Sequence, residues 1–267
     1  MSYYSESKDE LPPLGALTLD YTDDIHRPPG DVIMSISYDF PVIQQQVTNA
    51  TLVNVVKSEQ FDDDYINCYV EACNKLEDKG CIGIVTSCGF LAQIQDKLAS
   101  RINIPIATSS LLQIPYVLAT TSSKNMIGVL TFDSKTLNKN HFNGVGVTDE
   151  MMKRIVVVGC KPNNPLQRII KFGDPYIAKD LEEELVQMAV ELVKENPNVK
   201  AIVLECTNMP PYSKAIQEKV GLPVYDGITM VNWFYSGLKC KTLPKDENFE
   251  DGYRKRVRSN KELSYNT

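Results

Sequence analysis

The sequence predicts an α/β protein made of two pseudo-symmetric, Rossmann-like domains, each with a parallel sheet, and a cleft between them. Short apolar runs alternate with amphipathic helical patterns along most of the chain, which is the order of a parallel sheet with helical crossovers. Residues 84–106 and 202–224 also match each other position by position, without a gap. Residues 14–22 and 127–135 form a second matched pair in the same order, so an internal duplication is expected.

The first half alternates strands with helices. The apolar run at 14–20 predicts its first strand. Apolar residues at helical spacing predict a helix over 65–79 and an amphipathic helix over 90–101. Buried strands are expected at 81–87 and 104–107, on either side of the second helix.

The second half repeats this alternation and includes a long amphipathic helix. Its strands are expected at 126–132, 154–160, 200–205 and 222–225, and its helices at 178–195 and 212–220.

The domain limits follow from the repeat. We expect the first α/β domain over residues 11–123, completed by residues 225–240, and the second over 124–224. Residues 1–10 and 241–267 are polar or charged and lack apolar periodicity, so both are expected to be tails.

The composition of the 267 residues indicates which kinds of binding partner and which cellular compartment to expect. A net charge of −6 argues against a nucleic-acid surface, which relies on clustered Lys and Arg. No apolar stretch approaches the ~18–20 residues that span a bilayer, so no membrane partner is expected. The sequence has seven cysteines, an odd number, and its polar N-terminus does not resemble a secretion signal. These features predict reduced thiols and a cytoplasmic location. His26 and His141 are the only histidines and no CxxC or HxxxH spacing occurs, so no metal site is expected. The sequence leaves open whether the protein forms a homo-oligomer.

Two cysteines occupy equivalent positions in the repeat. Cys88 ends the apolar run of one matched segment, and Cys206 ends that of the other. Ligands of parallel sheets bind beyond the carboxyl ends of the strands, where both cysteines are expected. The N–H groups of a following helix can lower the pKa of a thiol there. Two such thiols on facing domains suit a reaction that removes a proton from one side of a carbon and returns it from the other.

The two cysteine motifs carry a family resemblance. "TSCGF" (86–90) and "LECTNMPPY" (204–212) resemble the motifs of the aspartate/glutamate racemase superfamily, over roughly residues 12–240. The resemblance implies two pseudo-symmetric domains with the active site between them, and catalysis by paired cysteines without pyridoxal phosphate. Carried over by position, Cys88 and Cys206 are the catalytic acid and base, and Thr207 binds substrate.

Further candidates flank the cysteines or lie at neighbouring strand ends, where hydroxyl and amide groups can hold an anion. The residues expected to bind substrate are Asp20, Gly89, Thr131, Ser134, Thr207 and Asn208.

Other polar residues near these strand ends have more ordinary interpretations. Asp133 suits a turn after a strand, although an orienting role stays open. Glu205 could act as a base beside Cys206, but strand alternation predicts that it points away from the face of Cys206. The loop "RPPGDV" (27–32) either lines the site or is only a rigid turn.

The predicted function is a cofactor-independent racemase or epimerase of a small amino acid or a derivative such as a hydantoin. Gly89 and Phe90 stand where glutamate racemases usually have Asn-Thr, so free glutamate and aspartate are not the expected substrates. One alternative is a cysteine-dependent cis–trans isomerase of an unsaturated diacid, in which one cysteine attacks as a nucleophile. Another is a protein that binds a small carboxylate without catalysis.

Overall fold

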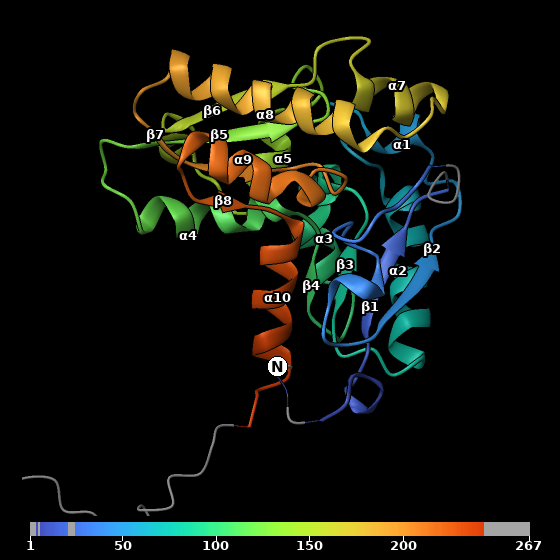
Figure 1. The fold of residues 1–267 in the computed structure, drawn as a ribbon. Helices are drawn as coiled ribbons and strands as arrows, with labels where there is room; N and C mark the ends of the chain where they lie inside the picture. The colour runs from blue at the N-terminus through green and yellow to red at the C-terminus, as the bar shows by residue number, and fades with distance from the viewer. Residues whose placement is uncertain (1–3, 5, 21–24, 243–267) are drawn as a thin grey trace, which may run out of the picture.

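A computed structural model describes residues 4, 6–20 and 25–242, which form two four-stranded parallel sheets covered by helices (Figure 1). The first sheet has the order β2-β1-β3-β4, and the second has the order β6-β5-β7-β8. Each strand of the first sheet therefore has a counterpart at the same place in the second, which confirms the predicted fold class. The strands are β1 (Leu14–Thr18), β2 (Val42–Gln46), β3 (Ile84–Thr86), β4 (Ile106–Ala107), β5 (Met126–Thr131), β6 (Ile155–Gly159), β7 (Val199–Leu204) and β8 (Val224–Tyr225).

One glycine in each sheet shows the duplication at the level of packing. A Cβ at Gly15 in β1 would come within 2.8 Å of Leu76, on helix α2 (Asp63–Asp78). A Cβ at Gly128 in β5 would come within 2.5 Å of Leu192, on helix α8 (Ala178–Glu195). Both central strands therefore use glycine to let the long helix of their own unit approach the sheet closely.

Shorter helices and 3₁₀ turns complete the two units. They are η1 (Lys8–Glu10), η3 (Ser35–Ser37), α1 (Leu52–Val55), η4 (Gly89–Ile94), α3 (Gln95–Ala99), η5 (Ser110–Gln113), α4 (Ile114–Ala119), α5 (Lys139–Gly144), α6 (Asp149–Met152), α7 (Pro165–Phe172), η6 (Pro210–Tyr212), α9 (Ser213–Val220) and α10 (Gly227–Leu238).

The structure differs from the expected elements after both cysteines. The helix predicted over 90–101 begins as the 3₁₀ turn η4 and becomes α-helical only at Gln95. The helix predicted over 212–220 likewise follows the 3₁₀ turn η6, which starts at a proline. Strand β2 was not predicted, because it lies at a sheet edge and three of its five residues are glutamines.

Helix α10 links the two units. It leaves β8 of the second sheet and runs beside β4 of the first (Figure 1). Its residue Tyr235 is fully buried and stacks on Phe40 with ring centroids 3.6 Å apart. The same apolar cluster includes Leu14 and Val85 of the first sheet. The C-terminal helix thus contributes to the core of the first unit, while the predicted limits of the two domains stay a prediction.

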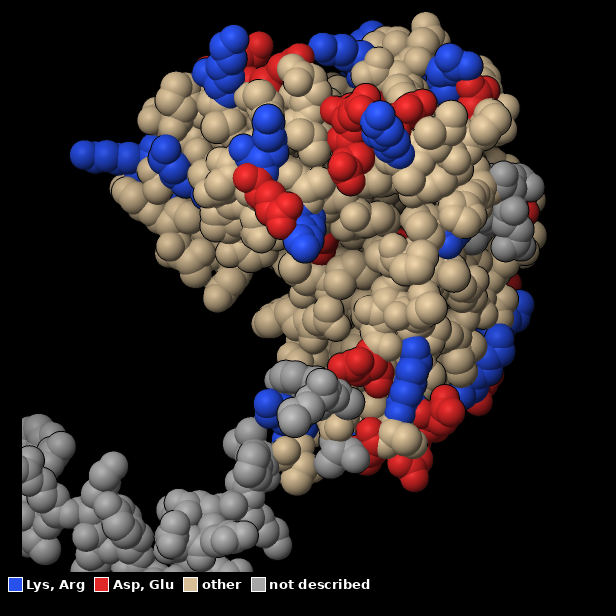
Figure 2. All heavy atoms as spheres, viewed as in Figure 1, with Lys and Arg blue, Asp and Glu red and all other residues tan. Residues whose placement is uncertain are grey.

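The surface carries charges of both signs. On the face drawn in Figure 2, Lys and Arg side chains lie among Asp and Glu side chains and do not gather in one patch. Among the described residues, no helix is both long enough and apolar enough to cross a membrane.

Candidate active site

The two predicted cysteines line one small cavity between the cysteine-bearing segments. Cys88 follows β3 and is the N-cap residue of η4, and Cys206 lies just beyond the end of β7. Both are free thiols with 8% of their surface exposed. The cavity has a volume of about 20 Å³, enough for about one water molecule. Its lining residues are Leu52, Val56, Ser87, Cys88, Gly89, Phe90, Phe132, Ile170, Glu205, Cys206, Thr207 and Asn208.

Two short hydrogen bonds join the segments of the two units around this cavity. The hydroxyl of Thr207 donates to the carbonyl oxygen of Ser87, at 2.6 Å. The hydroxyl of Ser110, in η5, donates to the carbonyl oxygen of Leu204 at the end of β7, also at 2.6 Å. Both bonds are buried. They hold the strand ends together, so the cavity stays small and a larger ligand must separate the segments to enter.

Burial holds both thiols in the protonated form, which differs from the lowered pKa expected at a helix start. Burial raises the pKa of Cys88 to about 12, and the negative charge of Glu205 adds to the increase. Burial and Glu205 likewise raise the pKa of Cys206 well above its ordinary value. The backbone N–H groups of Phe90 and Asn208 act in the expected direction and lower the pKa of the two thiols, but by less than burial raises it.

Glu205 lies in the cavity, although strand alternation predicted that it points away. Strand β7 ends at Leu204, so the alternation of the pleat no longer applies at the next residue. The side chain of Glu205 is 1% exposed, and its Oε2 accepts a hydrogen bond from Thr131 Oγ1 at 2.7 Å. Its Oε1 is buried without a hydrogen-bond partner among the described residues. Burial raises the pKa of Glu205 to about 7, against the opposing hydrogen bonds from Thr131 and the Phe132 N–H.

Gly89 gives the carboxyl group of Glu205 the room that it needs. A Cβ at Gly89 would overlap both Oε1 and the carbonyl oxygen of Glu205. The residue after the first cysteine and the residue before the second cysteine are therefore packed directly against each other. The sequence placed Gly89 among the substrate-binding residues, and the structure shows that it also accommodates this carboxyl group.

Three of the other expected substrate-binding residues lie at or beside the cavity, with hydrogen bonds already formed. Thr207 lines the cavity, and its hydroxyl proton is donated to the Ser87 carbonyl. Asn208 lines it too, and its Oδ1 lies 3.8 Å from Cys206 Sγ, which donates to it. Thr131 is buried behind Glu205 and bonds to it. Their roles toward a substrate stay predictions.

The described residues that line the cavity do not include Asp20 or Ser134. Asp20 is exposed, and its Oδ1 accepts a hydrogen bond from Gln46 Nε2 at 3.0 Å. Ser134 is exposed and packs against Gly159 at the end of β6. Both follow central strands as predicted, and their role toward a substrate stays a prediction.

The loop at 27–32 reaches the second cysteine segment through a buried aspartate. Asp31 is 0% exposed, and its Oδ2 accepts hydrogen bonds from Arg27 Nη1 at 3.1 Å and Asn208 Nδ2 at 3.0 Å. Burial raises the pKa of Asp31, and the charge of Arg27 opposes that increase. The loop therefore fixes the amide of Asn208, one contact away from Cys206.

Sequence reasoning missed Ser87 as a site residue. Its hydroxyl oxygen is buried on the cavity wall and has no hydrogen-bond partner in the described part of the chain. Ser87 precedes the cysteine in "TSCGF", and nothing in the sequence indicates which way its side chain turns. A buried hydroxyl without a partner is available to donate to a ligand oxygen.

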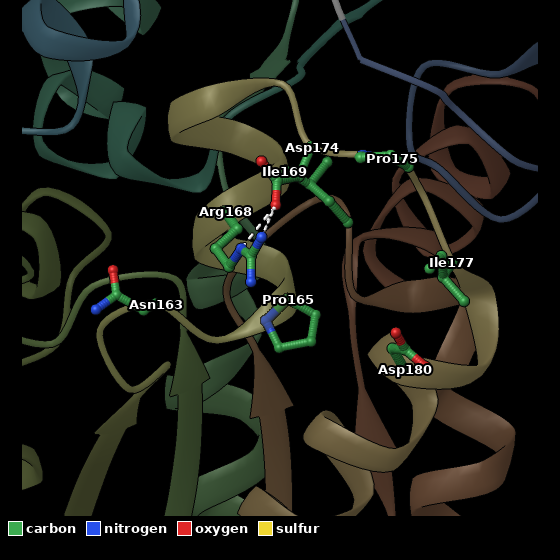
Figure 3. Close-up of a pocket in the computed structure, with 8 residues that line it drawn as sticks. All are labelled: Asn163, Pro165, Arg168, Ile169, Asp174, Pro175, Ile177 and Asp180. Carbon is green, nitrogen blue, oxygen red and sulfur yellow. Dashed lines mark hydrogen bonds and ion pairs between the residues drawn. The ribbon is translucent and has the colours of Figure 1, made fainter.

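A larger groove of about 230 Å³ is lined by α7, by the loop that follows it and by the start of α8 (Figure 3). An ion pair between Arg168 and Asp174 crosses it, with Arg168 Nε 2.6 Å from Asp174 Oδ2. Ile169 of α7 faces this groove, and the next residue, Ile170, lines the cysteine cavity. The groove is thus separated from the two thiols by the helix, and it contains no cysteine among its described lining residues.

Comparison with known proteins gives sequence relatives and structural neighbours with different names. No protein-family model matches the chain. It is 29% identical to dimethylsulfoniopropionate lyase 7 of Emiliania huxleyi (strain CCMP1516), over 86% of this chain and 68% of that protein. It is 28% identical to the dimethylsulfoniopropionate lyase of Durusdinium sp. clade D, over 84% of this chain and 74% of that protein.

The solved structures that resemble the chain share its fold at low sequence identity. An aspartate racemase homologue from Pyrococcus horikoshii OT3 has a TM-score of 0.57 and 16% identity, over 86% of this chain and all of that one. Unliganded arylmalonate decarboxylase has a TM-score of 0.52 and 13% identity, over 85% of this chain and 93% of that one. These neighbours show the fold: the chain has the same two-unit α/β fold as the aspartate racemase homologue and arylmalonate decarboxylase, which is the fold that the resemblance implied.

Proposed function

We propose that this protein is an enzyme that removes a proton from the carbon next to a carboxylate, with a cysteine thiolate as the base and without a cofactor. The observation that carries the proposal is that Cys88 and Cys206 line the same small cavity. A thiol on each side of one carbon supplies a base and an acid for a single proton-transfer reaction. Both outcomes that follow from such a step, elimination and racemisation, use these two groups.

Elimination is the outcome that the sequence relatives favour. Their names describe a lyase that acts on a propionate bearing a dimethylsulfonium group, and these relatives align with most of this chain. In such a reaction the base takes the proton next to the carboxylate, and that electron pair forms the carbon–carbon double bond. The bond from carbon to the leaving group breaks, and the group departs with its electrons. One thiolate is enough for this step, and the second thiol can donate a proton.

Racemisation is the outcome that the pairing of the thiols favours. One thiolate removes the proton, and the opposite thiol returns a proton to the other face of the carbon. The Ser87 hydroxyl has no partner among the described residues, whereas the polar groups of Thr207 and Asn208 are already hydrogen-bonded and Phe90 forms an apolar wall. A less polar or ring-closed acid derivative fits this lining better than glutamate or aspartate, whose ammonium and second carboxylate would need further partners.

Both reactions require the two units to open and close around the substrate. A cavity of about 20 Å³ does not admit a carboxylic acid, so the Thr207–Ser87 contact must part and form again around the ligand. Closure then excludes water from the carbanion-like transition state and strengthens the electrostatic interactions in the site. Burial beside this small cavity explains why both thiols are protonated.

The test is a product assay in deuterated buffer with dimethylsulfoniopropionate, both enantiomers of several amino acids, and 5-substituted hydantoins. Proton NMR distinguishes the outcomes, because elimination produces alkene signals and racemisation exchanges the proton next to the carbonyl without loss of substrate. We expect one of these patterns with the wild-type protein and neither with Cys88→Ser/Cys206→Ser. Binding of an acid, with no exchange and no new product, would leave only a carboxylate-binding protein.

A further inference from the structure

We propose that Glu205 is the group that receives the thiol proton when a cysteine of this site becomes a thiolate. This inference rests on the proposed function and adds a third residue to it. Glu205 would act through the cysteines without touching the substrate carbon, and it is therefore a positioning residue for the reactive thiolate. It was not among the substrate-binding or catalytic residues that the sequence predicted.

The geometry places this carboxyl group between the two cysteine motifs. Glu205 is joined to Cys206 in the chain, and its Oε1 packs against Gly89, the residue after Cys88. Oε2 accepts a hydrogen bond from the Thr131 hydroxyl, and the N–H of Phe132 also bonds to the carboxyl group. Oε1 remains, buried on the cavity side and without a partner among the residues that the structure describes. A carboxylate with one anchored oxygen and one free oxygen is arranged to accept a proton.

The charges in the cavity make such an acceptor necessary. Glu205 titrates with a pKa of about 7, whereas the pKa of Cys88 is about 12, so Glu205 ionises before this thiol. Two other buried charges act on the thiols: Asp31 raises the pKa of Cys206, and Arg27 lowers that of Cys88. That charge raises the pKa of both thiols. A thiolate that formed while Glu205 stayed ionised would put two negative charges in one small buried space, which is unfavourable.

Proton transfer to Glu205 removes this conflict. The S–H bond of the cysteine breaks, an O–H bond forms on the carboxyl group, and the site keeps one negative charge throughout. The thiolate then takes the substrate proton while Glu205 is neutral, and the proton returns to the thiol before the next turnover. No electrons are gained or lost, and no other reactant is required.

The experiment compares Glu205→Gln with Glu184→Gln as a matched control. Glu184 is also a buried carboxylate with an unpartnered oxygen and lies beside another cysteine, Cys160, whose pKa it raises. Two measurements are made on each full-length protein. One is the pH dependence of alkylation of Cys88 and Cys206 by iodoacetamide, resolved by peptide mass spectrometry. The other is the pH dependence of deuterium exchange into the acid that the wild-type protein turns over.

Alkylation tests, without any substrate, whether the charge of Glu205 affects the ionisation of the two cysteines. In Glu205→Gln, alkylation of both cysteines should begin at lower pH than in the wild type, because a negative charge has been removed. In Glu184→Gln it should follow the wild type. An unchanged alkylation profile in Glu205→Gln overturns the inference and leaves the proposed function standing. The expected alkylation shift, combined with no exchange of any acid by the wild type, overturns the proposed function instead.

Exchange tests the proton acceptor itself. The wild-type rate should rise with pH through the ionisation of Glu205 near neutrality. Glu205→Gln should lose that rise and exchange about 10²-fold more slowly at neutral pH, as expected when a general base is removed. If Glu205 only raised the pKa of the thiols by its charge and accepted no proton, Glu205→Gln would exchange faster than the wild type. That result contradicts the inference. If Glu205→Gln does not fold, Thr131→Val replaces it: losing the hydrogen bond should move the rise to higher pH, and an unmoved rise contradicts the inference.

Discussion

The pH dependence of stability gives a sharp test of the buried carboxyl group, because Glu205→Gln should make the protein more stable in alkaline solution. Folding raises the pKa of Glu205 from its ordinary value of 4.5 to about 7. Between these values the folded state binds a proton that the unfolded state has lost, so the free energy of unfolding falls as the pH rises. A pKa shift of about 2.5 pH units corresponds to a loss of about 3 kcal/mol in the free energy of unfolding. The full loss is reached above neutral pH.

His141 partly conceals this effect in the wild type. Burial lowers the pKa of His141 from 6.5 to about 4. The unfolded state then binds the extra proton, so this histidine makes the free energy of unfolding rise across nearly the same pH range. The two contributions are of similar size and opposite sign, so they largely cancel each other in the wild type. The informative quantity is therefore the difference between Glu205→Gln and the wild type.

The assay is guanidinium unfolding followed by circular dichroism at several pH values. The difference in the free energy of unfolding should be close to zero near pH 4 and should grow to about 3 kcal/mol in favour of Glu205→Gln at about pH 8. Glutamine can keep the Thr131 hydrogen bond, so the substitution removes the charge with little change in packing. A difference that does not vary with pH, or a less stable Glu205→Gln at alkaline pH, would refute a buried carboxyl group with a raised pKa.

Three further predictions concern the thiols and the packing around them. Cys88→Ser and Cys206→Ser should each slow turnover at least about 10²-fold in the NMR assay, and wild-type rates in both would rule out the paired thiols. Gly144→Ala should lower the free energy of unfolding by about 1–3 kcal/mol, because its Cβ would overlap the backbone of the segment carrying Phe90. Gly237→Ala is its control: the new Cβ meets no described atom within 4 Å, so chemical denaturation should show no loss, and equal losses would contradict the packing argument. Exposed Cys240 should react with iodoacetamide before either buried thiol, as intact-mass analysis can show, and faster labelling of Cys88 would mean that the cavity is open.

The alternation of apolar runs and helical patterns was sufficient to predict the architecture. The gap-free match around Cys88 and Cys206 led to the duplication, and the structure has the same strand order in both sheets. The matched glycines at positions 15 and 128 both allow a long helix to pack closely against the central strand of its sheet. These features follow from local periodicity and from repetition, both of which can be read from one sequence. Strand β2 could not be read in this way, because an edge strand rich in glutamine lacks a clear apolar pattern.

The chemistry of the site was less accessible to sequence reasoning. The expected lowering of the thiol pKa considered the helix start alone, whereas the structure adds burial under the opposite unit. The orientation of Glu205 depends on the strand ending at Leu204, a boundary that periodicity cannot locate to one residue. Ser87 became visible as a site residue only once its hydroxyl was found buried on the cavity wall. In each case the deciding fact is a contact between segments far apart in the sequence.

The proposed reaction needs two thiols that share the transfer of one proton, and deuterium exchange measures that transfer directly. The wild-type protein and Cys88→Ser/Cys206→Ser are incubated in deuterated buffer with the same set of acids, and the signal of the proton next to the carbonyl is followed by NMR. We predict that the wild type exchanges or eliminates this proton in at least one acid, and that the double variant, folded by circular dichroism, does neither. Equal exchange by the two proteins, or no reaction of any acid with the wild type, would contradict the account.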